Sequence, residues 1–217
     1  MPLEQRELLA SGARALGIDL SDTQCDTLLA YQAMLTKWNQ VYNLTAVRKP
    51  AEMLTHHLLD SLSVLPPLQQ HLAGRSARVL DVGSGGGLPG VILAIMLPDL
   101  DVTCVDTVGK KASFIRQVAG ELKLRNLGAA HARVEDLRLK PFDVITSRAF
   151  ASLADFTHLT RHLLAENGVW MAMKGKNPAD EIAALPAEWD VFHVEQLVVP
   201  GLNADRCLVW IRRAPPQ

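Results

Sequence analysis

The sequence is short of cysteine, of long hydrophobic runs and of excess charge of either sign. Its three cysteines, Cys25, Cys104 and Cys207, are scattered, odd in number and without a C-x-x-C pair, which argues against a disulfide framework or a structural zinc site and favours a reducing compartment. Lysine and arginine total 22 against 23 acidic residues, so the formal net charge is −1. A protein that held free nucleic acid by electrostatics alone would be more basic. Any RNA role would therefore need a local positive patch or a preassembled target.

Hydrophobic runs long enough to cross a membrane are missing. The longest run, Leu88–Leu97, has about half the required length. Glu4 and Glu7 stand where a secretory signal would have its apolar core. We therefore expect a soluble, cytoplasmic protein that binds no membrane. Hydrophobic residues still make up 48% of the 217 positions, enough for a substantial core in one domain with an appendage.

The first 72 residues show helical periodicity throughout and predict an N-terminal helical cap, residues 1–72. Their apolar positions recur every three or four residues, and turn or proline signals separate the segments. The expected helices are Pro2–Leu16, a longer helix from a cap at Ser21 to a break at Asn43–Thr45, and a third from Pro50 to just before Pro66–Pro67.

From residue 73 onward, short strands alternate with helices, which predicts a second domain, residues 73–217, with a doubly wound parallel α/β sheet. Helices are expected in the gaps until the last two strands. Pro200–Asp205 is too short for a crossover helix, so those two strands should pair antiparallel, an ending typical of the Rossmann-like class I S-adenosylmethionine-dependent methyltransferases. The seven strands are expected near residues 77–82, 101–106, 128–133, 142–147, 168–173, 190–199 and 206–212.

The segment Ala77–Gly90, ARVLDVGSGGGLPG, is the most informative part of the chain. An apolar strand runs into five glycines within eight positions, and a helix is expected to start near Leu88, with Pro89 suited to its first turn. Glycine adopts backbone conformations that other residues reach only at a cost, and it lets a ligand approach the main chain. A ligand-free turn is the alternative, disfavoured because so many glycines destabilise a fold.

The glycine spacing allows two cofactors. Gly85, Gly87 and Gly90 satisfy the G-x-G-x-x-G pattern of dinucleotide-binding folds. Gly83, Gly85 and Gly87 equally satisfy the G-x-G-x-G of S-adenosylmethionine-dependent methyltransferases. Asp81 favours the second cofactor, because a carboxylate before the turn would repel a pyrophosphate and would suit a sulfonium and an amino group.

Asp106 closes the second expected strand, 23 residues after Gly83. That offset is close to the one expected of a carboxylate that binds ribose hydroxyls, which both cofactors possess. The alternative is that Asp106 caps the helix beginning near Val108.

Seven segments spread over nearly the whole chain carry a more specific signal. They are WNQVYNLTAVR (Trp38–Arg48), HHLLDSL (His56–Leu62), LDVGSGGGLPG (Leu80–Gly90), GKKASFIRQV (Gly109–Val118), ARVEDL (Ala132–Leu137), SRAFASL (Ser147–Leu153) and MKGK (Met173–Lys176). In this order they resemble the bacterial RsmG (GidB) family, whose members methylate N7 of a guanine in small-subunit (16S) ribosomal RNA. The resemblance implies S-adenosyl-L-methionine as cofactor and ribosomal RNA as substrate. The neutral overall charge suggests RNA within an assembled or assembling 30S particle, and we expect a monomer.

The resemblance also implies site residues. The family's cofactor contacts fall on Gly83, Leu88, Val134, Glu135 and Arg148, and the spacing arguments above add Gly85 and Asp106. The alternatives are helix-to-sheet packing for Leu88 and a solvated carboxylate for Glu135. No metal site is expected, since His56–His57 lacks partners at ligand spacing and fits helix packing better.

Guanine N7 carries a lone pair and no proton, so its methylation requires no general base and depends mainly on alignment. Arg148, which follows the strand at 142–147, is the candidate catalytic residue because its guanidinium can brace a carboxylate, guanine O6 or a phosphate. Phe150 could stack on a splayed base or lie buried beneath the next helix. Candidate RNA contacts are Lys174 and Lys176, together with a patch of Arg48, Lys110 and Lys111 if these gather near the cofactor.

Three other functions stay open at this point. A methyltransferase acting on a small molecule or a protein would show an acidic or apolar surface beside the cofactor. A non-catalytic S-adenosylmethionine-binding assembly factor would transfer no methyl group to small subunits. A dinucleotide-dependent oxidoreductase would bind nicotinamide cofactors instead.

Overall fold

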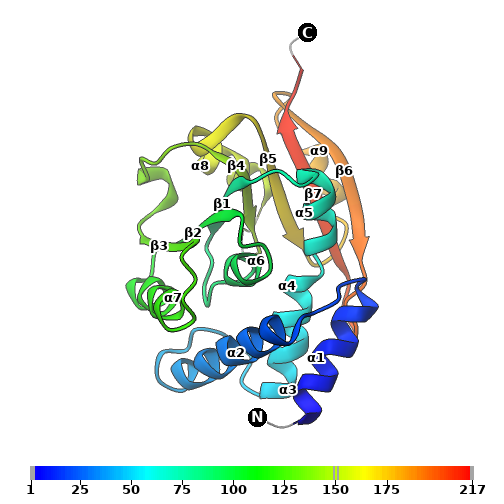
Figure 1. Cartoon of the computed structure of the whole chain (residues 1–217). Helices are drawn as coiled ribbons and strands as arrows, with labels where there is room; N and C mark the ends of the chain where they lie inside the picture. The colour runs from blue at the N-terminus through cyan, green and yellow to red at the C-terminus, as the bar shows by residue number, and fades with distance from the viewer. Residues whose placement is uncertain (1–2, 149, 151, 216–217) are drawn as a thin grey trace.

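A computed structural model describes residues 3–148, 150 and 152–215, so the predictions that touch Pro2, Ala149 and Ala151 lie outside the described residues. A seven-stranded sheet in the order β3-β2-β1-β4-β5-β7-β6 forms its centre (Figure 1). β7 pairs antiparallel with both β5 and β6, whereas the pairs among β1 to β5 are parallel. This confirms the predicted fold class. The strands are β1 (Ala77–Val82), β2 (Leu100–Asp106), β3 (Leu127–His131), β4 (Phe142–Ser147), β5 (Leu164–Lys174), β6 (Trp189–Leu197) and β7 (Arg206–Arg213).

The first helices precede the sheet. Ser21 begins α2 with a capping box, in which its side chain accepts from the backbone of Gln24 and the Gln24 side chain accepts from Ser21 N–H. Asn43 ends α2 in the left-handed region, at φ 50°. The bounds are α1 (Leu3–Ala15), α2 (Asp22–Tyr42), α3 (Pro50–Met53), a π-helical segment η1 (Leu54–Leu59), α4 (Asp60–Leu62) and α5 (Leu65–Leu72).

Two sequence predictions about helices are wrong in detail. The pair Pro66–Pro67 was expected only to follow a helix, but it lies in the first turn of α5, where proline's missing N–H costs no hydrogen bond. The gap between β3 and β4 was expected to hold a helix, but it holds only the single 3-10 turn η2 (Val134–Asp136), because few residues separate the strands and Pro141 lies among them. The remaining elements are α6 (Gly90–Met96), α7 (Gly109–Glu121), α8 (Leu153–Thr160), η3 (Arg161–Leu163) and α9 (Ala179–Ala183).

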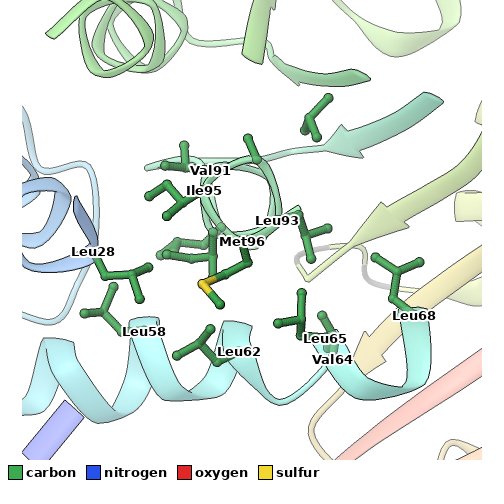
Figure 2. Close-up of a cluster of buried hydrophobic side chains, with 14 of the residues drawn as sticks. Leu28, Leu58, Leu62, Val64, Leu65, Leu68, Val91, Leu93, Ile95 and Met96 are labelled. Atoms are coloured by element: carbon green, nitrogen blue, oxygen red, sulfur yellow. The ribbon is translucent and has the colours of Figure 1, made fainter. Parts of the chain in front are cut away.

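One large core joins the N-terminal helices to the sheet. Leu28 of α2 and Leu58 of η1 point toward Val91 and Ile95 of α6, which is itself buried along its whole length (Figure 2). α7 packs on the same face of the sheet, and α8 covers the other face in a second cluster. The N-terminal helices therefore share their hydrophobic contacts with the sheet domain. The division of the chain at residue 72 stays a prediction.

Some sites are absent from the part of the chain that the structure describes. None of its helices combines the length and the apolar character that a membrane crossing needs. Its histidines, cysteines and carboxylates form no group of three or more that could hold a metal ion. Cys25, Cys104 and Cys207 are buried free thiols, as their scattered positions predict.

Candidate active site

The glycine-rich turn after β1 is fixed to the end of β2. Gly83 N–H and Ser84 N–H both donate to the Val105 carbonyl, at 2.9 and 3.2 Å. Gly83 and Gly85 have φ values of 68° and 57°, in the region where a side chain would be strained. The turn therefore requires glycine for its own conformation, and it presents main chain at the carboxyl edge of the sheet.

Helix α2 also contacts the glycine-rich turn. The Tyr31 hydroxyl donates to the Gly86 carbonyl at 2.7 Å, and a Cβ at Gly86 would lie 2.8 Å from a methyl group of Leu35. Tyr31 is fully buried, which raises the pKa of its phenol and keeps it a hydrogen-bond donor. The N-terminal helices thus hold the turn in place.

A first cavity of about 440 Å³ opens where β1, β2 and the segment after β3 meet. Gly83, Asp106 and Lys111 are among the residues that line it. Apolar atoms and a few charged groups together suit a ligand with both a flat ring and a polar sugar. The remaining lining residues are Val82, Val105, Thr107, Val108, Ala132, Arg133, Val134, Glu135, Phe150 and Leu159.

Asp106 links the first cavity to the glycine turn. One carboxylate oxygen accepts from Gly85 N–H at 3.0 Å, and the other accepts from Val108 N–H at 2.9 Å. Lys111 Nζ lies 3.6 Å from the carboxylate. α7 has no side-chain cap, since its N-cap position is Val108. A carboxylate offers about four acceptor positions, so Asp106 keeps capacity for hydroxyl groups in the cavity.

Val134 and Glu135 belong to η2 and also line this cavity. Val134 is buried, and Glu135 accepts from Arg133 Nε at 2.8 Å. Hydrogen bonding to the Glu135 backbone and to Arg133 lowers the pKa of the Glu135 carboxyl, so this residue stays ionised at the cavity rim.

The interpretation of Asp81 as a partner for a sulfonium is not supported by its position. Strand alternation turns Asp81 to the same side as Val79, toward α6, where it is fully buried and outside both cavities described here. One carboxylate oxygen accepts from Gly90 N–H at 2.8 Å, and the other has no hydrogen-bond partner among the described residues. Burial raises the pKa of Asp81 to about 7.

A second cavity of about 360 Å³ lies at the same edge of the sheet and is lined mainly by polar side chains. Asp60, at the start of α4, is 1% exposed and pairs with two arginines. Arg148 Nη1 lies 3.1 Å from one carboxylate oxygen, and Arg206 Nε lies 2.7 Å from the other. Arg148 also donates to the His56 carbonyl at 3.0 Å. Two guanidinium groups share one carboxylate, so the cluster carries an excess positive charge.

His57 borders this cluster without forming a metal site. Its Nε2 lies 2.8 Å from the Thr45 hydroxyl, and its Nδ1 lies 3.0 Å from the His56 carbonyl. Burial, together with the positive charge of Arg148, lowers the pKa of His57 to about 4. The ring is therefore neutral at physiological pH, and it braces the loop that leads from α2 to α3.

The structure separates the predicted site residues into groups. Gly83, Asp106, Val134 and Glu135 line the first cavity, while Arg148 lines the second. The other two predicted residues, Gly85 and Leu88, line neither cavity. Gly85 donates its N–H to Asp106, and the Leu88 side chain packs in the core.

The other candidates are distributed over the same edge. Phe150 lines the first cavity and packs against Phe156 of α8, with ring centroids 5.2 Å apart. Lys174 lines the second cavity and pairs with Glu181 at 2.8 Å.

Asp60 and Arg206 are functional candidates that the sequence argument missed. Asp60 lies within HHLLDSL, a segment that carries the family resemblance, but only its two histidines were weighed as site residues. Arg206 begins β7, 58 positions after Arg148, and no local pattern marks it.

Comparison of the whole chain with known proteins shows which family it matches. The family described as rRNA small subunit methyltransferase G (GidB) matches residues 24–209. A ribosomal RNA small subunit methyltransferase G from Acidovorax sp. (strain JS42) is 63% identical over 212 residues, which cover 94% of this chain and 93% of that protein. The protein of the same name from Leptothrix cholodnii is 62% identical over 207 residues, 95% of each chain.

Solved structures resemble the chain in fold alone, because the identities are low. TrmN from Thermus thermophilus aligns with a TM-score of 0.57 at 20% identity, over 74% of this chain and 53% of that chain. A ribosomal protein L11 methylase from Lactobacillus delbrueckii subsp. bulgaricus aligns with a TM-score of 0.55 at 15% identity, over 71% and 76%. The shared architecture is the class I methyltransferase sheet.

Proposed function

The chain belongs to the rRNA small subunit methyltransferase G family, and we propose on that basis that it transfers a methyl group from S-adenosylmethionine to guanine N7 in small-subunit ribosomal RNA. The observation that carries the proposal is the pair of cavities at the carboxyl edge of the sheet. Arg148, which follows β4, lines one cavity, and Phe150 lines the other. A donor and an acceptor could therefore meet at the end of β4.

The first cavity fits S-adenosylmethionine. Asp106 would accept hydrogen bonds from the ribose hydroxyls, Val134 would contact the adenine ring, and the ionised Glu135 at the rim would accept from the adenine amino group. The turn at Gly83 would let the ligand approach the main chain closely. When bound, this cofactor supplies a methyl carbon activated by a positively charged sulfur.

The second cavity suits the acceptor guanine. Arg148 donates from Nη1 to Asp60 and His56, and its remaining N–H groups have no partner among the described residues. These donors could bind guanine O6 or a neighbouring phosphate and hold N7 in line with the methyl group. Reacting atoms about 3–3.5 Å apart and aligned supply most of the catalysis that such a transfer needs. Asp60 would orient Arg148 through their ion pair, and no group has to remove a proton.

The substrate is small-subunit RNA within an assembled or assembling 30S particle, on which the protein acts as a monomer in the cytoplasm. The net charge of −1 supports this context, because a nearly neutral protein gains little from attraction to free RNA. The Arg148 and Arg206 cluster would instead supply local positive charge at the site.

The proposal is tested by mapping methylated guanines by mass in small-subunit RNA from cells with and without the gene. The expected result is one guanine that carries an N7-methyl group only when the gene is present. Purified small subunits incubated with the protein and labelled S-adenosylmethionine should become labelled at that guanine. Identical methylation maps in the two strains would refute the proposal, and binding without transfer would favour an assembly factor.

Arg148→Ala tests the assigned role of the arginine. We expect kcat for small subunits to fall by about a hundredfold or more, the usual cost of removing one essential donor. The variant should also melt at a lower temperature, because the buried Asp60 would keep only Arg206 as its partner. Arg148→Lys, which restores the charge, separates loss of charge from loss of the guanidinium geometry. Arg161→Ala, outside both cavities, is the control, and an Arg148→Ala enzyme as active as this control would exclude the assignment.

A further inference from the structure

An exposed aromatic ring lies where α2 ends, beside the first turn of α7. Tyr42 is the last residue of α2 and is 40% exposed. Its neighbour Val41 and the N-cap residue of α7, Val108, are also exposed hydrophobic side chains. Figure 1 shows this end of α2 beneath α7, and the two helices are in contact. A soluble surface carries single exposed hydrophobic residues without special reason, but a group at one place calls for an explanation.

Two basic side chains lie at this end of α2. Lys110 Nζ lies 4.8 Å from the Tyr42 ring centroid, and Arg48 Nη2 donates to the Asn43 side chain at 3.4 Å. We use the name aromatic–basic surface for the five residues Val41, Tyr42, Arg48, Val108 and Lys110. Arg48 and Lys110 supply its positive charge. An aromatic ring with basic neighbours matches single-stranded nucleic acid, in which bases stack and phosphates need cations.

The ring is supported from beneath. Tyr42 contacts Trp38 with centroids 5.1 Å apart, and Trp38 contacts the buried Phe114 at 5.4 Å. Lys110 covers the ring only through an exposed cation–π contact, which is weaker than the stacking of a base on an aromatic ring. A base could therefore replace the ammonium over Tyr42, and the ammonium would then be close to the phosphate of that nucleotide.

The surface adjoins the first cavity, and a short loop connects it in sequence to the second. Val108 belongs to the lining of the first cavity, and the loop that starts at Asn43 reaches Val47, which lines the second. The carbonyl of Leu44 in the same loop lies 4.0 Å from the position of a Cβ at Gly85. A strand lying on Tyr42 would therefore have a short path to the proposed acceptor cavity.

We propose that the aromatic–basic surface binds an unpaired ribosomal RNA nucleotide near the target guanine, with its base stacked on Tyr42 and its phosphate paired with Lys110. This inference rests on the proposed function and adds a docking position for its RNA substrate. Tyr42 acts here by binding the substrate and takes no part in the chemical step.

The test compares small-subunit binding and methylation by the wild-type protein, Tyr42→Ala, Tyr42→Phe and Phe192→Ala. Phe192 is the matched control, since it is 36% exposed and has the Arg212 guanidinium 4.9 Å from its ring centroid, but it lies on the edge strand β6. We expect Tyr42→Ala to raise KM for small subunits at least about fivefold. That factor corresponds to the smallest loss of affinity expected when one base no longer stacks on an aromatic ring. The kcat of the variant and its S-adenosylmethionine Kd should stay unchanged, and Tyr42→Phe should behave as wild type.

Lys110→Gln gives an independent readout. Loss of one phosphate contact should flatten the slope of log K for binding of small subunits against log salt by about 0.7. Binding is measured without a methyl donor, so a failure of this surface is distinct from a failure of methyl transfer. A Tyr42→Ala protein that binds small subunits as Phe192→Ala does, or an unchanged salt slope in Lys110→Gln, would overturn the inference. The unchanged S-adenosylmethionine affinity confirms that each variant is folded.

Discussion

Asp81 should make the protein more stable at low pH than at neutral pH, which is unusual for a carboxylate. The residue is buried between β1 and α6, with one oxygen bound to Gly90 N–H and the other without a partner among the described residues. No lysine or arginine in the described part of the chain forms an ion pair with it, so burial penalises the ionised form. Asp81→Asn is the informative change, because asparagine has the same shape, can still accept from Gly90 and is neutral at every pH.

The magnitude follows from the two pKa values. The Asp81 pKa is about 7 in the folded protein, against an ordinary value of 3.8. Between these values the folded state holds a proton that the unfolded state has released, so the free energy of unfolding falls as pH rises. A difference of about three units, at 1.36 kcal/mol each, amounts to about 4 kcal/mol. The stabilisation that comes from protonation of Asp81 is fully present below pH 4 and is lost above pH 7.

Urea unfolding of both proteins from pH 4.5 to 8.5 measures this effect. The difference in free energy of unfolding between Asp81→Asn and wild type should increase in favour of the variant by several kcal/mol over that range, on the scale worked out above. His57 titrates with the opposite sign, since its pKa is lowered to about 4, but it is present in both proteins and cancels. A difference that stays flat with pH would refute a neutral, buried Asp81.

Two further predictions concern the first cavity. Gly85→Val should lose at least 1–2 kcal/mol of stability, because a branched side chain is strained at φ 57°. It should also abolish S-adenosylmethionine binding in calorimetry, and a variant with full affinity would show that the turn does not belong to the cofactor site. Asp106→Ala should weaken that binding by about 1–3 kcal/mol through lost ribose hydrogen bonds and a loosened Gly85, and an unchanged Kd would leave Asp106 with a structural role only.

The sheet could be predicted from sequence because its signals are local. Several strands contain a short apolar run, as Cys207–Ile211 of β7 does, and the short Pro200–Asp205 link alone requires the last pair to be antiparallel. The capping box at Ser21 is equally local. The π-helical turn at Leu54–Leu59 carries no comparable signal, since it inserts one extra residue per turn into a sequence that otherwise has helical periodicity.

The first cavity was also largely predictable. Gly83 and Asp106 end adjacent parallel strands, and strand ends meet at one edge of the sheet whatever the connecting helices do. Asp81 shows the limit of the argument. Its residue type and distance from the glycines suit a cation, but alternation along β1 directs its side chain under α6, which only the paired sheet makes evident.

The second cavity could not be predicted, because its charge balance is assembled from three distant parts of the chain. Asp60 comes from the N-terminal helices, Arg148 follows β4, and Arg206 begins the last strand. The net charge of the cluster depends on all three side chains together. No single segment of the sequence therefore determines it. This arrangement explains how a chain of net charge −1 can present local positive charge at the proposed acceptor site. The N-terminal helices supply the carboxylate that orients Arg148 and the tyrosine that holds the glycine turn, so their removal should disable the site even if the sheet still folds.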